Sequence, residues 1–470
     1  MSVSGRPVIY YECTNTFHSP VQTGIQRVVR NVARCIGPLA AARGFDVAPV
    51  VFVDGQLRMA DLAQVLTDKL ALRVIVESVD PPRPVPRFSL KDGLRLGYRA
   101  VRRGLSVLLP FPAAQRFLYA HPIEFGLAWL VLQPWRIMRR LWRGDGPAPS
   151  VAVAADPVAL DDGFGASLDA VSNHAGDVLL LLDASWSIPL WDAVERFQAA
   201  GGVTHGVIYD LVPITHADTS VRSLRAEYEN WVRAHLRLSG RFVTISRTVQ
   251  AQLSTYLAEQ GPAPFRVRSF YLGSELDFID PGQLPRPEVA AVFAGAAHVF
   301  IAVGSIEPRK NHGFLLDAFD LLWGQGLPVR LVIIGRFGWK NEAVVARILT
   351  HPELGRRLFL MRDMTDSELD FAYREASALV IPSESEGFGL PVVEAFQRGL
   401  QVICSDIAVF REIAGGHAVF FDLSSPARLA EAVDMFCGTH DPLTRRERHP
   451  VPWLTWEEST TELLDAVLLG

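Results

Sequence analysis

The chain has 470 residues, of which 49% are hydrophobic, and its formal net charge is −5 at pH 7. At about 100–200 residues per domain, this length predicts two or three domains with full hydrophobic cores. The negative charge argues against a general nucleic-acid binder. The four cysteines are widely spaced and form no C-x-x-C pair, so they indicate neither a disulfide framework nor a zinc site. Since no run reaches the roughly 18 apolar residues of a membrane span and no signal-peptide core precedes the first apolar run, we expect a cytoplasmic protein.

The first half of the chain alternates apolar runs with helical periodicity. An apolar run at 8–11 is followed by Ile25, Val28 and Val29, which have helical spacing, and Gly24 lies where this helix would begin. Further strands are expected at 50–53, 178–182, 205–209, 242–245 and 267–272. Alternation of this kind predicts a parallel α/β sheet.

Two polar side chains follow the strand expected at 205–209. Asp210 comes directly after it, and His216 lies a few residues further on. In open α/β sheets, ligands bind at the carboxyl ends of the strands, so both residues are candidate ligand contacts. A helix-capping Asp and a surface His explain them equally well.

A segment at 273–289 is rich in Pro and Gly and lacks periodicity, which predicts a linker between two domains. Strands are expected after it at 298–304, 329–334, 358–361, 378–382, 401–404 and 418–421. We therefore predict an α/β protein with two Rossmann-like domains, at residues 1–285 and 290–453, and a C-terminal helix within 454–470. No G-x-G-x-x-G fingerprint is present, so a dinucleotide oxidoreductase has no support.

Arg309 and Lys310 are adjacent cations between the strand at 298–304 and the next expected helix. The helix dipole disfavours cations at a helix N-terminus, so an anionic partner explains them better than a solvated helix start does. A diphosphate would suit both, because Arg binds through a planar fork and Lys acts as a point charge.

The loop after the strand at 378–382 is the most informative stretch of the chain. Gly387 and Gly389 allow the backbone to approach a ligand closely. Glu386 precedes these glycines, and Glu394 lies in the first turn of the helix that follows. Ionised carboxylates only accept hydrogen bonds, which suits hydroxyl-rich ligands such as ribose and sugar rings. A pair of capping or solvated glutamates is the alternative.

Glu386 and Glu394 enclose seven residues, and the intervening Gly-Phe-Gly-Leu-Pro-Val-Val resembles the E-x7-E element of family 4 glycosyltransferases. The resemblance implies the GT-B fold, in which two Rossmann-like domains with parallel sheets face each other across a cleft. It also implies that Glu386 contacts the donor sugar and Glu394 the nucleotide ribose. The loop residues whose amides would contact the sugar and phosphates are Gly387, Phe388, Gly389 and Leu390.

Other positions match the same family less closely. Lys310 matches its donor-domain cation, while Ser305 stands where the family usually has Arg. Arg309 lies in Glu-Pro-Arg-Lys-Asn, a form that resembles a mannosyltransferase-like branch of the family. The resemblance implies that Arg309 supplies the charge of the missing Arg. Gly24 resembles the family's glycine-rich loop ahead of the first helix, which faces the donor phosphates and the acceptor. Tyr209 stands where family members often have His.

The resemblance implies a retaining, metal-independent glycosyltransferase of surface polysaccharide synthesis. It would transfer a hexose, with mannose as one candidate, from a nucleotide-diphosphate sugar to a saccharide or lipid-linked acceptor. No cofactor is implied besides the donor substrate, and the implied catalytic residues are Arg309, Lys310 and Glu386. Two alternatives stay open: a nucleotide-sugar 2-epimerase of the same fold, and a non-catalytic scaffold of a polysaccharide-assembly complex.

Residues 81–150 resemble nothing in this core fold and form a basic, aromatic insertion in the first predicted domain. The basic residues are Arg83, Arg87, Lys91, Arg95, Arg99, Arg102, Arg103, Arg116, Arg136, Arg139, Arg140 and Arg143. Trp, Phe and Leu beside Arg suit an interfacial helix on anionic lipid. We therefore expect peripheral binding at the cytoplasmic face of an anionic membrane. The alternative is an insertion that packs on its own domain or contacts an acidic partner.

Overall fold

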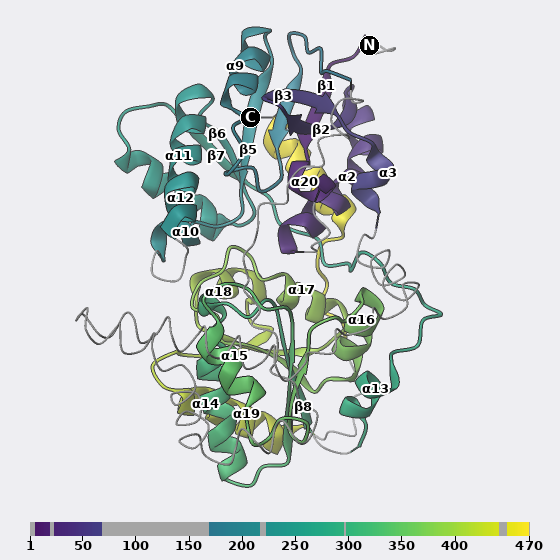
Figure 1. Cartoon of the computed structure of the whole chain (residues 1–470), viewed down its shortest axis with the longest axis vertical. Helices are drawn as coiled ribbons and strands as arrows, with labels where there is room; N and C mark the ends of the chain where they lie inside the picture. The colour runs from purple at the N-terminus through teal and green to yellow at the C-terminus, as the bar shows by residue number, and fades with distance from the viewer. Residues whose placement is uncertain are drawn as a thin grey trace, which may run out of the picture. The chain divides into compact units, whose positions relative to one another are not determined.

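The structure is a computed structural model that describes residues 5–18, 23–67, 169–216, 222–295, 298–440 and 449–469. All of these residues belong to one compact unit of the chain. They form two β-sheets, each flanked by helices (Figure 1). The basic insertion predicted at 81–150 lies outside the described residues.

Within the described ranges, the first sheet has seven strands in the order β3-β2-β1-β4-β5-β6-β7. These are β1 (Val8–Glu12), β2 (Asp46–Val53), β3 (Gln56–Met59), β4 (Val178–Leu181), β5 (Val203–Ile208), β6 (Arg241–Thr244) and β7 (Arg266–Ser269). Their helices are α1 (Thr14–His18), α2 (Gly24–Ala41), α3 (Leu62–Leu66), α9 (Trp191–Ala199), α10 (Val212–Thr215), α11 (Arg222–Leu238) and α12 (Arg247–Glu259). The pairs are parallel except β2 with β3. The continuous apolar runs of β1 and β4 therefore lie in the sheet interior, as expected for parallel strands.

The second sheet has six strands among the residues described, all parallel, in the order β10-β9-β8-β11-β12-β13. They are β8 (His298–Val303), β9 (Val329–Ile334), β10 (Leu358–Met361), β11 (Ala378–Ile381), β12 (Gln401–Ser405) and β13 (Ala418–Phe421). The helical segments are α13 (Pro287–Phe293), η2 (Pro308–Lys310), α14 (His312–Gly324), α15 (Glu342–Leu349), α16 (Asp366–Glu375), α17 (Leu390–Gln397), α18 (Ala408–Ala414) and α19 (Pro426–Thr439). The predicted α/β fold with two Rossmann-like sheets is confirmed, whereas the domain boundaries at 285 and 290 stay predictions.

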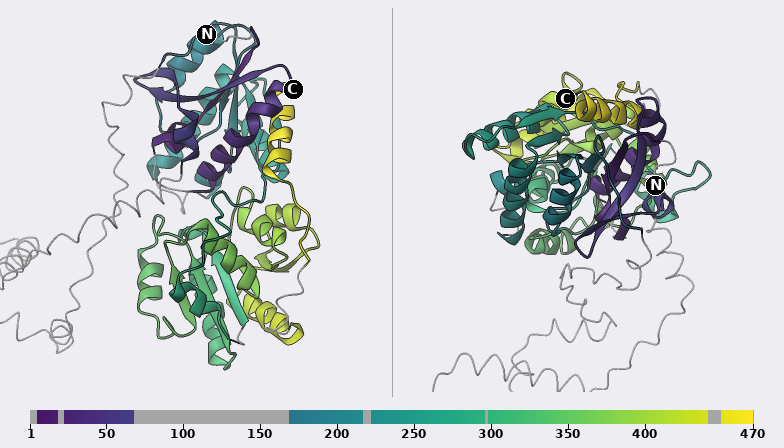
Figure 2. Two further views of the ribbon diagram at one scale, coloured as in Figure 1. Left: turned by 90° about the vertical axis from the view of Figure 1, so that its right-hand side faces the viewer. Right: turned by 90° about the horizontal axis from the view of Figure 1, so that it is seen from above.

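The last helix, α20 (Trp456–Leu468), packs against α2, β6 and β7 of the first sheet, beside α2 in Figure 2. Arg43, just after the end of α2, donates to Asp465 at 2.7 Å, and the Tyr271 amide donates to Glu462 at 2.9 Å. After the second sheet, the chain therefore crosses back to the first sheet through α20. Of the helices formed by described residues, none is both long and apolar enough to cross a membrane.

One strand was missing from the sequence-based prediction. β3 forms a hairpin with β2 through Asp54 and Gly55, whose φ angles are 50° and 69°. Two positive φ angles at Asp-Gly are typical of the tight turn that joins antiparallel strands. The Asp-Gly pair was therefore the signal that could have revealed this edge strand.

Candidate functional site

The loop between β11 and α17 has the backbone geometry that its glycines predicted. Gly389 is the N-cap of α17 with φ 106°, a conformation that residues with a side chain rarely adopt. A Cβ atom there would lie 2.8 Å from Phe410 Cε1. The helix begins at Leu390 with Pro391 in its first turn, so the predicted passage from strand through glycine loop to helix is observed.

Glu386 lies at the centre of the cluster that this loop helps to form. Its carboxylate accepts hydrogen bonds from the side chains of Arg309 and Lys310, and from the Ser383 hydroxyl at 2.8 Å. The side chain is only 7% exposed. Burial alone would raise the pKa of Glu386, but the charges of Arg309 and Lys310 outweigh it and lower that pKa to about 2. The carboxylate is therefore ionised at neutral pH.

Arg309 is held from several sides at the carboxyl end of β8. Its guanidinium donates to the Ser385 carbonyl at 3.2 Å and lies 2.7 Å from Glu307 Oε1. Burial acts to lower the pKa of Arg309, whereas the charges of Glu386 and Glu307 raise it. The structure thus brings the three predicted catalytic residues, Arg309, Lys310 and Glu386, into one ion-pair cluster.

The same loop contacts the first sheet where Asp210 follows β5. A Cβ atom on Gly387 would lie 1.8 Å from the Tyr209 carbonyl oxygen and 3.1 Å from Asp210 Cβ. Ser246 donates to the Gly387 carbonyl at 2.8 Å. Burial raises the pKa of Asp210, and the nearby Arg309 acts to lower it. Asp210 therefore lies within electrostatic reach of the cation cluster.

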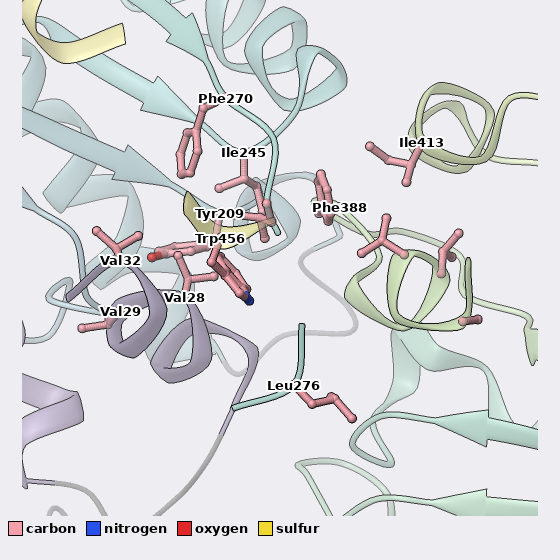
Figure 3. Packing of buried hydrophobic residues seen from close by; sticks show 14 of the residues in the cluster. Val28, Val29, Val32, Tyr209, Ile245, Phe270, Leu276, Phe388, Ile413 and Trp456 are labelled. Atoms are coloured by element: carbon pink, nitrogen blue, oxygen red, sulfur yellow. The ribbon is translucent and has the colours of Figure 1, made fainter. Parts of the chain in front are cut away.

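Three further predicted site residues, Gly24, Phe388 and His216, lie in different surroundings. Gly24 begins α2 close to the loop, since a Cβ atom there would lie 3.6 Å from Leu390 Cδ1. Phe388 is buried in the core cluster that also contains Tyr209 (Figure 3). His216 ends α10 with its Nδ1 atom 2.9 Å from Thr215 Oγ1, and its ligand contact stays a prediction.

Tyr209 departs from the family's usual His, and its surroundings give a structural reason. The ring is 8% exposed, and the hydroxyl donates to the Leu182 carbonyl at 2.6 Å. The side chain thus ties the end of β5 to the end of β4. Tyr209 is a core residue whose hydroxyl is hydrogen-bonded, as buried polar atoms usually are.

Glu394 has partners that the sequence did not reveal. It is 2% exposed and accepts a hydrogen bond from Tyr373 at 2.6 Å and another from Arg27 on α2. Arg27 also donates to Asp366 at 3.1 Å. One signal could have identified Arg27, because a cation in the first turn of a helix opposes the helix dipole and therefore calls for an anionic partner.

The arrangement offers positive charge and hydrogen-bond donors to an anion, and carboxylates to hydroxyl groups. Arg309 and Lys310 contact Glu386 in the loop that leads to α17, and the dipole at the N-terminus of that helix also favours an anion. Among the residues that the structure describes, no group of His, Cys, Asp or Glu side chains is placed to hold a metal ion. The independence from metals stays a prediction.

The structure thus has two Rossmann-like sheets and a buried cluster of ion pairs at the carboxyl end of the second. Residues 291–445, which include the second sheet, match the family model described as glycosyl transferases group 1. The resemblance noted at the E-x7-E element is therefore confirmed.

Curated relatives extend the similarity beyond this domain. The chain is 32% identical over 297 residues to the serotype-specific mannosyltransferase WbdA of Escherichia coli, covering 61% of this chain and 36% of that protein. It is 28% identical over 174 residues to the O-antigen chain mannosyltransferase B of Escherichia coli, covering 36% of this chain and 45% of that one. The chain thus spans about a third of the length of the WbdA proteins it matches.

A solved structure shows the same fold at low identity. The sucrose-phosphate synthase from Thermosynechococcus elongatus is similar with a TM-score of 0.50 and 15% identity, covering 99% of this chain and 94% of that chain. The predicted GT-B fold is confirmed.

Proposed function

We propose that this chain is a retaining glycosyltransferase that moves a hexose from a nucleotide-diphosphate sugar to a saccharide or lipid-linked acceptor in surface polysaccharide synthesis. The observation that carries the proposal is the convergence of Arg309 and Lys310 on Glu386 beside the glycine loop. The group 1 domain and the mannosyltransferase relatives support it, and they favour mannose as the hexose.

The leaving group of such a reaction is a nucleoside diphosphate. The main catalytic demand is therefore to stabilise negative charge on the diphosphate as its bond to the sugar breaks. Within the cluster, Glu386 is an anion that both Arg309 and Lys310 contact. The donor diphosphate would take over both cations, which frees the Glu386 carboxylate to accept hydrogen bonds from sugar hydroxyls. Glu394 would accept from the ribose.

Retention requires attack from the face that the diphosphate leaves. The leaving phosphate would take the acceptor proton, so we assign no carboxylate as nucleophile. We propose no metal ion and no cofactor besides the donor. Asp210, close to the cation cluster from the first sheet, and His216 are the residues proposed to face the substrates from that side.

A thermal-shift panel of UDP, GDP, ADP and their hexose conjugates tests donor binding. A ligand that binds only the folded state raises the free energy of unfolding by about 2.7 kcal/mol at 100 times its dissociation constant. We expect a rise in melting temperature with at least one nucleotide and its sugar, followed by hexose transfer to an added acceptor in product analysis. An altered sugar formed without acceptor would indicate the epimerase, and no thermal shift with any nucleotide would indicate the scaffold.

We further propose that the chain binds the cytoplasmic face of an anionic membrane through residues 81–150, which brings the catalytic site near a lipid-linked acceptor. The support is the sequence of this segment, in which basic residues alternate with Trp, Phe and Leu. Each basic residue near the surface adds about 1 kcal/mol of binding free energy, and salt weakens it.

Co-sedimentation with phosphatidylglycerol vesicles at low and high salt tests this mode of binding. The wild type is expected to pellet at low salt, and a variant with Arg136, Arg139, Arg140 and Arg143 changed to Ser is expected to pellet less. Phosphatidylcholine vesicles serve as the control without net charge. Equal pelleting of both proteins, or of neither, contradicts the proposal.

A further inference from the structure

Both oxygens of the Glu394 carboxylate have a hydrogen-bond donor within the chain. Oε1 accepts from the Arg27 guanidinium, and Oε2 accepts from the Tyr373 hydroxyl at 2.6 Å. Two donors at opposite oxygens fix the plane of the carboxylate. An ionised carboxylate has about four acceptor positions, so two remain for hydroxyl groups of a ligand.

Arg27 reaches Glu394 from α2, a helix of the first sheet, although Glu394 lies on α17 of the second. Its side chain is 16% exposed and lies near two further carboxylates, with Asp366 at 3.1 Å and Asp277 at 3.9 Å. Burial acts to lower the pKa of Arg27. The charges of Glu394, Asp366 and Asp277 raise this pKa, with the largest effect from Glu394, so the guanidinium stays charged. A planar guanidinium can donate to two carboxylates at once, which the ammonium of Lys does less well.

The attachment of α2 does not depend on the contact with Glu394. Val28, Val29 and Val32 of this helix pack into the hydrophobic core (Figure 3). On the polar side, Arg30 donates to Asp277 at 2.9 Å, which ties α2 to the segment that joins the two sheets. The Arg27 contact with Glu394 is therefore additional to the packing of the helix.

We propose that Arg27 is a positioning residue of the donor site: from the first sheet, it holds the Glu394 carboxylate in the orientation that accepts hydrogen bonds from the ribose hydroxyls. Tyr373 holds the second oxygen in the same way. The proposal rests on the glycosyltransferase function proposed above, and it adds a residue far outside the E-x7-E element to the determinants of ribose recognition.

The test separates loss of ribose recognition from general loss of structure. Calorimetry gives dissociation constants for UDP, GDP and ADP, each beside its 2′,3′-dideoxy analogue, which lacks the hydroxyls that Glu394 would bind. A hydrogen bond to a charged group changes affinity by about tenfold or more, so the wild type should prefer at least one ribonucleotide by about that factor. Arg27→Met should reduce this ratio to within about threefold of unity, and Tyr373→Phe should reduce it less.

Arg30→Met is the matched control, because it removes the same type of side chain from the next turn of α2 and breaks a bond to Asp277 but none to Glu394. It should keep the wild-type ratio. If Arg27→Met weakened the ribonucleotide and its analogue equally, Arg27 would act through packing alone, and the inference would be overturned while the proposed function stood. An unchanged ratio in Glu394→Ala also overturns it. If the wild type bound none of the three nucleotides, both the inference and the proposed function would fail.

Discussion

The two sheets carry buried acidic side chains at the same place, the carboxyl ends of their strands, but in opposite electrostatic surroundings. At the first sheet, Glu12 ends β1 and is fully buried, and Asp183 follows the neighbouring β4 and is 2% exposed. Backbone amides donate to both acids, Thr14 N to Glu12 at 2.8 Å and Thr16 N to Asp183 at 2.6 Å, and the hydroxyls of the same two threonines also contribute. At the second sheet, Glu386 instead meets two cations.

This difference in surroundings shifts the pKa values of the carboxyl groups in opposite directions. Burial and the neighbouring Asp183 raise the pKa of Glu12 to about 8, and burial raises the pKa of Asp183. At Glu386, the cations more than offset the same effect of burial and lower the pKa to about 2. The first pair of acids thus accepts hydrogen bonds from amides of α1 and is shifted towards the protonated form, whereas Glu386 stays ionised beside two cations. Similar sheets provide similar positions, and the charged side chains beside them decide the chemistry.

The largest effect is expected from removing the cations that distinguish the second sheet. Lys310→Ala and Arg309→Ala should each lower the initial rate of hexose transfer by about 100–1,000-fold, the usual cost of losing a donor that stabilises developing charge. The melting temperature should change far less than the rate. Arg356→Ala is the control, since that side chain is 72% exposed and lies 3.7 Å from Glu353. Near-normal rates in Lys310→Ala would remove this residue from the site.

The sequence was sufficient for the second-sheet cluster because its signals are local. Arg309 and Lys310 follow a continuous apolar strand, and Glu386 and Glu394 flank a glycine loop, so strand-end rules alone bring them to one edge. The roles of these residues stay predictions.

What the sequence missed depends on tertiary partners. Arg27 and Tyr373 contact Glu394 across long separations in the chain, and helical periodicity does not show which polar residue faces a carboxylate on another element. Glu12 was missed for a different reason. It directly follows the apolar run at 8–11, and the argument that selected Asp210 at the end of β5 would have selected Glu12 at the end of β1.

The second prediction concerns the point where the two regions meet. Gly387→Ala places a Cβ atom 1.8 Å from the Tyr209 carbonyl oxygen, so the backbone of the loop or of the first sheet must move. Overpacking of this kind costs about 1–3 kcal/mol of unfolding free energy, and we expect a lower melting temperature together with weaker nucleotide binding. Gly438→Ala is the control: it lies in α19 with no heavy atom within 4 Å of the added Cβ, and it should raise stability by up to about 1 kcal/mol. A Gly387→Ala protein that melts and binds nucleotide like the wild type would show that this close contact is not needed.

The last prediction concerns the first sheet, where Glu12→Gln tests the raised pKa. In the unfolded chain the Glu12 pKa is near its ordinary value of 4.5, and in the folded chain it is about 8. Folding therefore takes up a proton between these pH values, so the contribution of Glu12 to stability is fully present below pH 4.5 and decreases as pH rises towards 8. Glutamine resembles the protonated side chain and does not titrate, so the melting temperature of the wild type should fall relative to Glu12→Gln as pH is raised from 5 to 8. Asp183→Asn removes the neighbouring charge and should weaken this trend.

Glu386, whose pKa is lowered, has the opposite sign: its contribution to stability is present above pH 4.5 and is lost as pH falls towards 2. A constant difference in melting temperature between wild type and Glu12→Gln across pH 5–8 would mean that Glu12 is ionised in the folded protein, and the contrast between the two sheets would then disappear.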